Sequence, residues 1–154
     1  MSTNEKPPRA RPSWDSYFMQ MAHLVATRAT CDRKHVGAVI VHERRVLATG
    51  YNGSAPGQPH CDDVGHDLVT LEGGRTNCVR TLHAEANAIL QGSLYGVALR
   101  GADIYTNTFP CWPCAKMILG AGLARVFVDA DYNNDERVMA AFESKGVKLV
   151  RYKE

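Results

Sequence analysis

Two short motifs constrain the fold of this chain more than any other feature: residues 83–85 read His-Ala-Glu and residues 110–114 read Pro-Cys-Trp-Pro-Cys. They supply one imidazole and two thiols, which are zinc ligands, and one carboxylate that need not bind the metal. A structural zinc normally has four protein ligands, whereas a catalytic zinc keeps a position for water and lowers its pKa from about 15.7 to near 7. The sequence therefore predicts a fold that brings His83, Cys111 and Cys114 to one catalytic zinc, with Glu85 beside it.

Each motif is predicted to begin a helix. Residues 84–93 and 112–121 are rich in helix-forming side chains, and Pro113 suits a first helical turn. The free N–H groups and the positive end of a helix dipole favour the thiolate form of a nearby cysteine, which is the form that zinc binds. Glu85 would lie in the first turn of its helix, where it can transfer protons without ligating the metal.

The remaining pattern predicts a layered α/β domain. Residues 14–29 have apolar side chains at helical spacing, and two apolar runs at 36–41 and 45–51 predict an antiparallel hairpin. Further helices at 84–93, 112–121 and 134–144 are expected to alternate with strands at 102–107, 125–129 and 147–151, an alternation that is typical of α/β proteins.

Length and composition indicate one catalytic domain, residues 13–154, preceded by a flexible tail, residues 1–12. The chain has 154 residues, and its first twelve contain three prolines and no large apolar side chain after Met1. It has neither an apolar run long enough to span a bilayer nor a signal-peptide core, so we expect no membrane association and a cytoplasmic location. The net charge of +2 and scattered basic residues argue against a nucleic-acid partner.

Residues 52–83 form a long stretch without periodicity, and such a stretch in a small domain needs something to hold it. Two of the remaining cysteines lie in it. We expect a second, closed zinc site formed by Cys31, Cys61, His66 and Cys78. The alternative is that these are ordinary buried thiols. His60 is the rival fourth ligand, and His35 a weaker one.

The motifs resemble those of deoxycytidylate deaminases, including the phage and late-competence types. The similar segments are residues 36–41 (Val-Gly-Ala-Val-Ile-Val), 50–53 (Gly-Tyr-Asn-Gly), 83–89 and 109–111, and the resemblance extends over about residues 13–150. His-x-Glu with Pro-Cys-x-x-Cys is the signature of zinc deaminases of nucleobases. The resemblance implies a three-layer α/β/α fold with a five-stranded mixed sheet. It also implies hydrolysis of dCMP to dUMP and ammonia, which supplies dUMP for dTMP synthesis.

The resemblance further implies several binding roles. Asn52 would contact the sugar hydroxyl, although Asn-Gly is also a turn signal, and Tyr132 would lie near the nucleotide or be an exposed loop residue. Arg28, Arg33 or Lys34 would bind the phosphate, with plain surface exposure as the alternative. Some relatives have a second zinc, with cysteines that match Cys31 and Cys61, and the late-competence type often has cysteine at the position of His66.

Assembly and regulation are likewise implied only by the resemblance: a homo-oligomer, most commonly a hexamer, activated by dCTP with Mg²⁺ and inhibited by dTTP. Thr108 departs from the relatives, which commonly have an apolar residue or histidine there. Two other readings stay open. A tRNA adenosine or free-base deaminase would use the same metal chemistry, and a nonenzymatic zinc-stabilised interaction module would close the first zinc site with further ligands.

Overall fold

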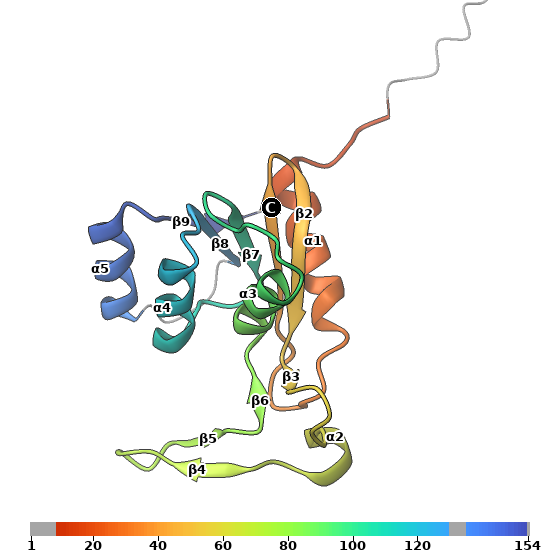
Figure 1. Cartoon of the computed structure of the whole chain (residues 1–154), viewed down its shortest axis with the longest axis vertical. Helices are drawn as coiled ribbons and strands as arrows, with labels where there is room; N and C mark the ends of the chain where they lie inside the picture. The colour runs from red at the N-terminus through yellow and green to blue at the C-terminus, as the bar shows by residue number, and fades with distance from the viewer. Residues whose placement is uncertain (1–8, 130–134, 154) are drawn as a thin grey trace, which may run out of the picture.

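The computed structural model describes residues 9–129 and 135–153. Five helices and nine strands are assigned in these ranges (Figure 1). The helices are α1 (Trp14–Ala26), α2 (Cys61–Val64), α3 (Ala84–Leu94), α4 (Trp112–Gly120) and α5 (Glu136–Lys145). The main sheet contains β1 (Gly37–His42), β2 (Arg45–Tyr51), β7 (Asp103–Thr106), β8 (Arg125–Asp129) and β9 (Lys148–Tyr152). Four shorter strands are β3 (Gly53–Ser54), β4 (Leu68–Thr70), β5 (Thr76–Cys78) and β6 (Thr81–Leu82).

The main sheet has the strand order β2-β1-β7-β8-β9. Strand β1 pairs antiparallel with both β2 and β7, whereas β7, β8 and β9 run parallel to one another. The predicted hairpin is therefore confirmed, and its two-residue turn places Glu43 and Arg44 at positive φ, as tight hairpin turns require. The predicted five-stranded mixed sheet is also confirmed.

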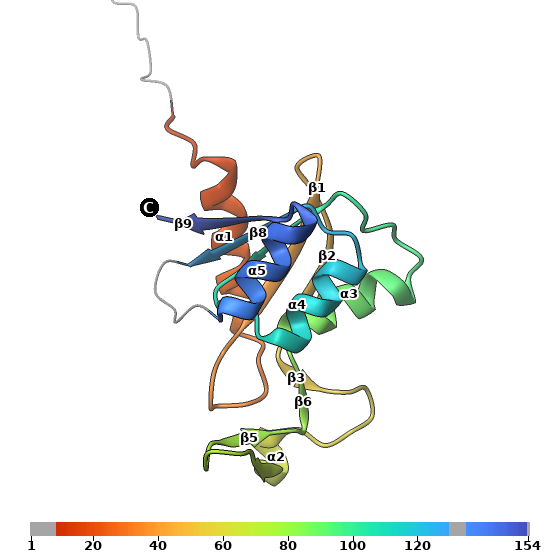
Figure 2. The same cartoon turned by 90° about the vertical axis from the view of Figure 1, so that its left-hand side faces the viewer.

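Helices cover both faces of this sheet. Side chains of a strand alternate between faces, so Val39 and Val41 pack with Phe18 and Met19 of α1 on one side. Ala38 and Ile40 face the other side, where the helices α3, α4 and α5 supply apolar side chains to the larger core. Figure 2 shows these three helices in front of the sheet and α1 behind it. The predicted three-layer α/β/α architecture is confirmed.

Helix α1 is shorter than the periodicity predicts. It ends at Ala26, and the backbone N–H groups of Thr27, Arg28 and Ala29 bond to carbonyls three residues earlier. Such bonds tighten the last turn and turn the chain away from the helix axis. The next amide, that of Thr30, donates to the carbonyl of Asn52 at 3.1 Å, which joins the end of α1 to the end of β2.

Residues 55–80 leave the body of the domain and are called the arm below. The arm contains α2 and the hairpin of β4 and β5, and its base is the short pairing of β3 with β6 (Figure 1). All of its residues lie in the described part of the chain, and among them only Cys61 and Cys78 are buried. The arm therefore has no apolar core of its own beyond these two thiols.

Candidate active site

His83 and Cys111 occupy equivalent places in the fold, because each is the N-cap residue of a helix, α3 and α4 respectively. Neither side chain caps its own helix, so both are free to face each other. The His83 Nδ1 atom lies 3.3 Å from Cys111 Sγ and 3.5 Å from Cys114 Sγ. A tetrahedral zinc with bonds of about 2.0 Å to nitrogen and 2.3 Å to sulfur would separate such atoms by about 3.5 Å. The residues present fit a three-ligand zinc site.

The electrostatics of the two thiols differ: that of Cys111 suits a cation, whereas hydrogen bonding with Cys111 raises the pKa of the Cys114 thiol above its usual value. Hydrogen bonding from Cys114 is the main effect that lowers the pKa of the Cys111 thiol, to about 4. Cys111 is thus ready to act as a thiolate, the form in which cysteine binds zinc. Pro113 lies in the first turn of α4, where a missing N–H leaves no helical hydrogen bond unmade.

Glu85 lies in the first turn of α3 and is 2% exposed. Burial raises the pKa of its carboxyl group above the usual value. It belongs to the same cavity as His83 and Cys111 but not to the group of ligand atoms that lie within 4.8 Å of one another. This arrangement gives the carboxyl group access to a molecule in the cavity without making it a ligand, as proton transfer requires.

The cavity has a volume of about 320 Å³, which is within the usual range for small-molecule sites. His83, Glu85 and Cys111 line one part of the cavity. The segment before β1 supplies Arg33 and Lys34 to the lining, and the end of the arm supplies Asn77; these three residues form a basic and polar wall. Asn52, which follows β2, and Thr81 of β6 line the cavity as well.

Two asparagine side chains fix the segment that leads into β1. The Asn52 amide accepts from the Val36 N–H at 2.8 Å and donates to the Lys34 carbonyl at 2.7 Å. Asn107, which directly follows β7, accepts from Gly37 N–H and donates to the His35 carbonyl, both at 3.0 Å. These bonds hold the backbone of Lys34 at the rim of the cavity. Asn107 was not among the residues expected here, and its only signal in the sequence is its place between a strand and the second motif.

Lys34 also contacts the cavity through its side chain. Its Nζ atom donates to the Thr108 hydroxyl, and both residues line the cavity. Thr108 is buried, so the residue that departs from the resembling family lies inside the site rather than on the surface.

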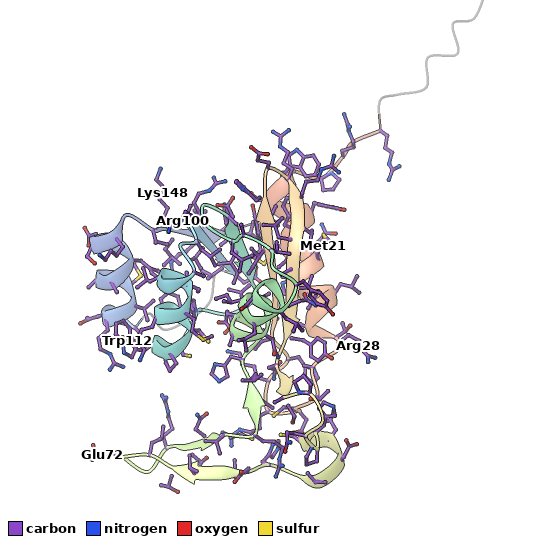
Figure 3. The ribbon with its side chains drawn as sticks, in the orientation of Figure 1. Met21, Arg28, Glu72, Arg100, Trp112 and Lys148 are labelled. Atoms are coloured by element: carbon purple, nitrogen blue, oxygen red, sulfur yellow. The ribbon has the colours of Figure 1, made fainter. Side chains whose placement is uncertain are left out.

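The predicted binding residues do not all meet here. Arg33 lines the cavity, and its Nη2 donates to the Thr76 carbonyl at 3.2 Å. Arg28 is exposed at the end of α1 and is not among the residues that line the cavity (Figure 3). Asn52 also lines the cavity, and its side-chain amide is hydrogen-bonded to the backbone of Val36 and Lys34. Tyr132 lies outside the described residues.

A second group of ligand atoms adjoins the cavity. The predicted residues Cys31, Cys61, His66 and Cys78 lie together, with all four ligand atoms within 4.8 Å of one another. Cys61 Sγ is 3.6 Å from Cys78 Sγ, and Cys31 Sγ is 3.6 Å from His66 Nδ1. His60, the rival ligand, instead places its Nδ1 atom 2.9 Å from the Thr30 hydroxyl.

The surroundings of His66 and Cys78 favour metal ligation, whereas burial raises the pKa of the Cys61 thiol to about 12. Asp32 contacts His66 Nε2 at 2.9 Å, which leaves Nδ1 facing the thiols. Metal-binding histidines commonly have such a carboxylate partner. Burial acts to raise the pKa of Cys78, but hydrogen bonds from the backbone of Arg80 and Asp67 bring it down to about 7.

Trp112 follows the ligand Cys111 as the first residue of α4. The Lys116 ammonium and the Arg137 guanidinium each lie 5.8 Å from its ring centre. The indole is partly buried against the main core. It follows Cys111 in the chain and is not among the residues that line the cavity.

The fold and this site together define a class: a metal-dependent α/β enzyme in which three ligands and a buried carboxyl group meet at a cavity. Comparison with known proteins narrows the class. Residues 12–130 match the family described as the cytidine and deoxycytidylate deaminase zinc-binding region. The chain belongs to this family.

Individual relatives support the same assignment. ComE operon protein 2 of Bacillus subtilis is 45% identical over 139 residues, which cover 90% of this chain and 71% of that protein. The deoxycytidylate deaminase of Mycobacterium phage D29 is 40% identical over 76% of this chain and 94% of its own length. The Schizosaccharomyces pombe deoxycytidylate deaminase is 38% identical over 95% of this chain, which spans only 46% of that longer protein.

A solved structure agrees with the fold. The dCMP deaminase of cyanophage S-TIM5, in complex with dCMP and dUMP, superposes with a TM-score of 0.75 at 28% identity. The match covers 94% of this chain and 100% of the phage chain. Within the described residues, no helix combines the length and apolar character needed to cross a membrane.

Proposed function

We propose that this protein is a zinc-dependent dCMP deaminase, which hydrolyses dCMP to dUMP and ammonia. The observation that carries the proposal is the grouping of His83, Cys111 and Cys114 at a cavity that His83, Cys111 and the buried Glu85 line. The family assignment and the similarity to deaminases whose names specify deoxycytidylate support the substrate.

The residues divide the chemistry between them. His83 Nδ1 and the two thiolates would hold the zinc, which when bound acts as a Lewis acid that lowers the pKa of water to near 7. Glu85 takes a proton from the attacking water and delivers it to N3 of cytosine, and then assists the departure of ammonia from C4. Its burial suits this role, because a raised pKa makes the carboxyl group both able to accept and able to release the proton.

The substrate is tested by measuring ammonia release with dCMP, CMP, dCTP, deoxycytidine, guanine and a tRNA anticodon stem in parallel. We expect the highest kcat/KM with dCMP. Equal values with dCMP and deoxycytidine would remove the nucleotide assignment, and turnover of the tRNA stem or guanine alone would favour one of the alternative deaminases. No turnover of any substrate by zinc-loaded protein would favour the interaction module.

We also propose a second, structural zinc bound by Cys31, Cys61, His66 and Cys78. Three thiols and one imidazole are a common closed tetrahedral set, and the contact of Asp32 with His66 supports it. Elemental analysis of the purified protein should give two zinc ions per chain. A single zinc would sink this part of the proposal and leave the catalytic site untouched.

Assembly and regulation are proposed on the resemblance to deoxycytidylate deaminases. The exposed apolar residues Leu90, Leu94 and Tyr95 of the α3 region support a homo-oligomer, because soluble chains rarely leave such neighbours uncovered. Light scattering with and without dCTP and Mg²⁺ should report a hexamer, and dTTP should inhibit turnover. A monomer whose rate ignores both nucleotides would contradict both expectations.

A cytoplasmic location is proposed as well. The five cysteines are free thiols, and thiolate metal sites persist in reducing compartments. Cell fractionation would test this location.

A further inference from the structure

The second cysteine-histidine group adjoins the substrate cavity rather than a remote part of the surface. Cys31 and Cys78, two of its four members, themselves line the cavity. Cys31 precedes Arg33 and Lys34 by two and three residues, and Asn77 directly precedes Cys78. The wall that carries Arg33, Lys34 and Asn77 is therefore built from the two chain segments that the group joins.

The arm has few other means of keeping its position. Among residues 55–80 only Cys61 and Cys78 are buried, and the hairpin of β4 and β5 forms a two-stranded sheet of its own. An isolated two-stranded hairpin is marginally stable in water. Figure 1 shows this hairpin projecting from the body of the domain, and its tip is marked by Glu72 in Figure 3.

The bonds that cross from the arm to the body gather around the same group. Asp62 N–H donates to the Thr30 carbonyl at 3.2 Å, and Arg33 donates to the Thr76 carbonyl at 3.2 Å. Both bonds join the segment after α1 to a part of the arm that carries a cysteine of the group. A metal ion held by four ligands would fix both parts at once, because structural zinc supplies folding energy where an apolar core is missing.

The charge of this wall indicates which end of a substrate it faces. Arg33 and Lys34 are cations and Asn77 is a hydrogen-bond donor, and they line the same cavity as Glu85, the group proposed to act on the base. A nucleotide whose base lies at Glu85 would extend its anionic phosphate toward this wall. Guanidinium and ammonium groups bind phosphate by strong charge-assisted hydrogen bonds, which depend on the exact placement of the donors.

We infer that the second metal group is a positioning element of the substrate cavity: metal bound by Cys31, Cys61, His66 and Cys78 holds the phosphate-facing wall in place. This inference rests on the proposed function and deepens it. Loss of that metal would weaken binding of a nucleotide and leave the proton transfer at Glu85 intact, since His83, Cys111 and Cys114 belong to a separate ligand group.

The test is the variant His66→Ala, in which the least buried ligand of the group is removed. We expect it to lose one of two zinc ions. Its KM for dCMP should rise about tenfold or more, the loss that accompanies one charge-assisted hydrogen bond, with kcat within about threefold of wild type. Its kcat/KM for deoxycytidine, which has no phosphate, should change little. Calorimetric binding of dUMP should weaken in step with KM.

Two further variants separate positioning from general damage. His66→Cys supplies a fourth thiolate and should restore both the second zinc and the KM. His60→Gln changes a neighbouring histidine outside the group and should keep two zinc ions and the wild-type KM. Should His66→Ala not fold, Asp32→Asn takes its place, because loss of a carboxylate partner typically weakens metal affinity by about 10- to 100-fold.

Defined outcomes would overturn the inference. The inference is wrong if a variant loses one zinc yet keeps the wild-type KM for dCMP and the wild-type affinity for dUMP. It is also wrong if kcat/KM falls equally for dCMP and deoxycytidine, because an equal fall indicates a cavity damaged as a whole. Failure of the proposed function would look different: the wild-type protein itself, with both zinc ions bound, would not prefer dCMP.

Discussion

Gly50 of β2 lies where the main sheet supports the helix that carries His83 and Glu85. A Cβ atom built at this position would lie 2.3 Å from the Ala84 carbonyl oxygen and 2.4 Å from the Ala88 nitrogen. Both neighbours are backbone atoms of α3, so no side-chain rotation can relieve the contact. The variant Gly50→Ala must therefore push the first turns of α3 away from the sheet.

The size of the effect follows from these distances. Ordinary contacts of a Cβ atom begin at 3.4 Å, so the helix must move by about 1 Å. Overpacking of this kind costs about 1 to 3 kcal/mol, and the upper end applies because the obstacle is rigid. For a chain of this length that corresponds to a fall in Tm of about 6 to 12 °C. A displacement of about 1 Å at catalytic groups can also lower the rate by about 100-fold.

Thermal unfolding, zinc content and ammonia release measured on the same preparations would check this prediction. Gly120→Ala is the matched control, because a Cβ atom at Gly120 meets nothing within 4 Å. It should leave Tm and turnover unchanged or raise Tm slightly. If Gly50→Ala melts within about 2 °C of this control and keeps its turnover, the sheet does not position α3 as we argue.

Three other variants give separate tests. Glu85→Gln should retain zinc and lose about 10²- to 10⁴-fold in kcat, as judged by elemental analysis and ammonia release; full turnover would exclude proton transfer by Glu85. Asn107→Ala leaves two backbone groups at the start of β1, the Gly37 N–H and the His35 carbonyl, without their partners, so unfolding in urea should show a loss of about 1 to 3 kcal/mol, and an unchanged midpoint would mean that water replaces the amide. Tyr105→Phe removes the hydrogen bond to Asp15, which should cost about 1 kcal/mol in the same assay, and a cost above about 3 kcal/mol would point to a role beyond this bond.

The sequence was most informative where apolar periodicity and chemistry coincide. The predicted strand at 125–129 matches β8, and the predicted helices at 84–93 and 112–121 match α3 and α4 to within one residue. Each helix begins directly after a residue of a predicted metal-binding motif, His83 for α3 and Cys111 for α4. The structure also brings His83, Cys111 and Cys114 together, while their roles remain predictions.

The arm could not be predicted in detail, because its structure does not depend on apolar periodicity. Leu68 and Val69 of β4 are both exposed, so the strand has no alternation that a sequence pattern could reveal. The only sequence signal in this segment was the pair of cysteines, Cys61 and Cys78, which predicted a metal site there.

Tertiary contacts between residues far apart in the chain could not be predicted from the sequence either. Gly50 belongs to a segment that resembles the family, but no sequence signal shows that it lies against a helix backbone while Gly120 meets open space. The sequence also gives no sign that Lys34 and Thr108, which are far apart in the chain, are joined by a hydrogen bond in the cavity. The expectation that Arg28 binds phosphate came from the resemblance alone, and the structure places Arg28 exposed just after α1, outside the residues that line the cavity.

The position of Trp112 gives the protein an optical reporter. The chain has two tryptophans, and the other, Trp14, stacks on Phe18 at the far end of α1. In a Trp14→Phe background all indole fluorescence would come from the residue that adjoins Cys111. Its emission could then follow the filling and emptying of the catalytic centre in real time, without any substrate being turned over.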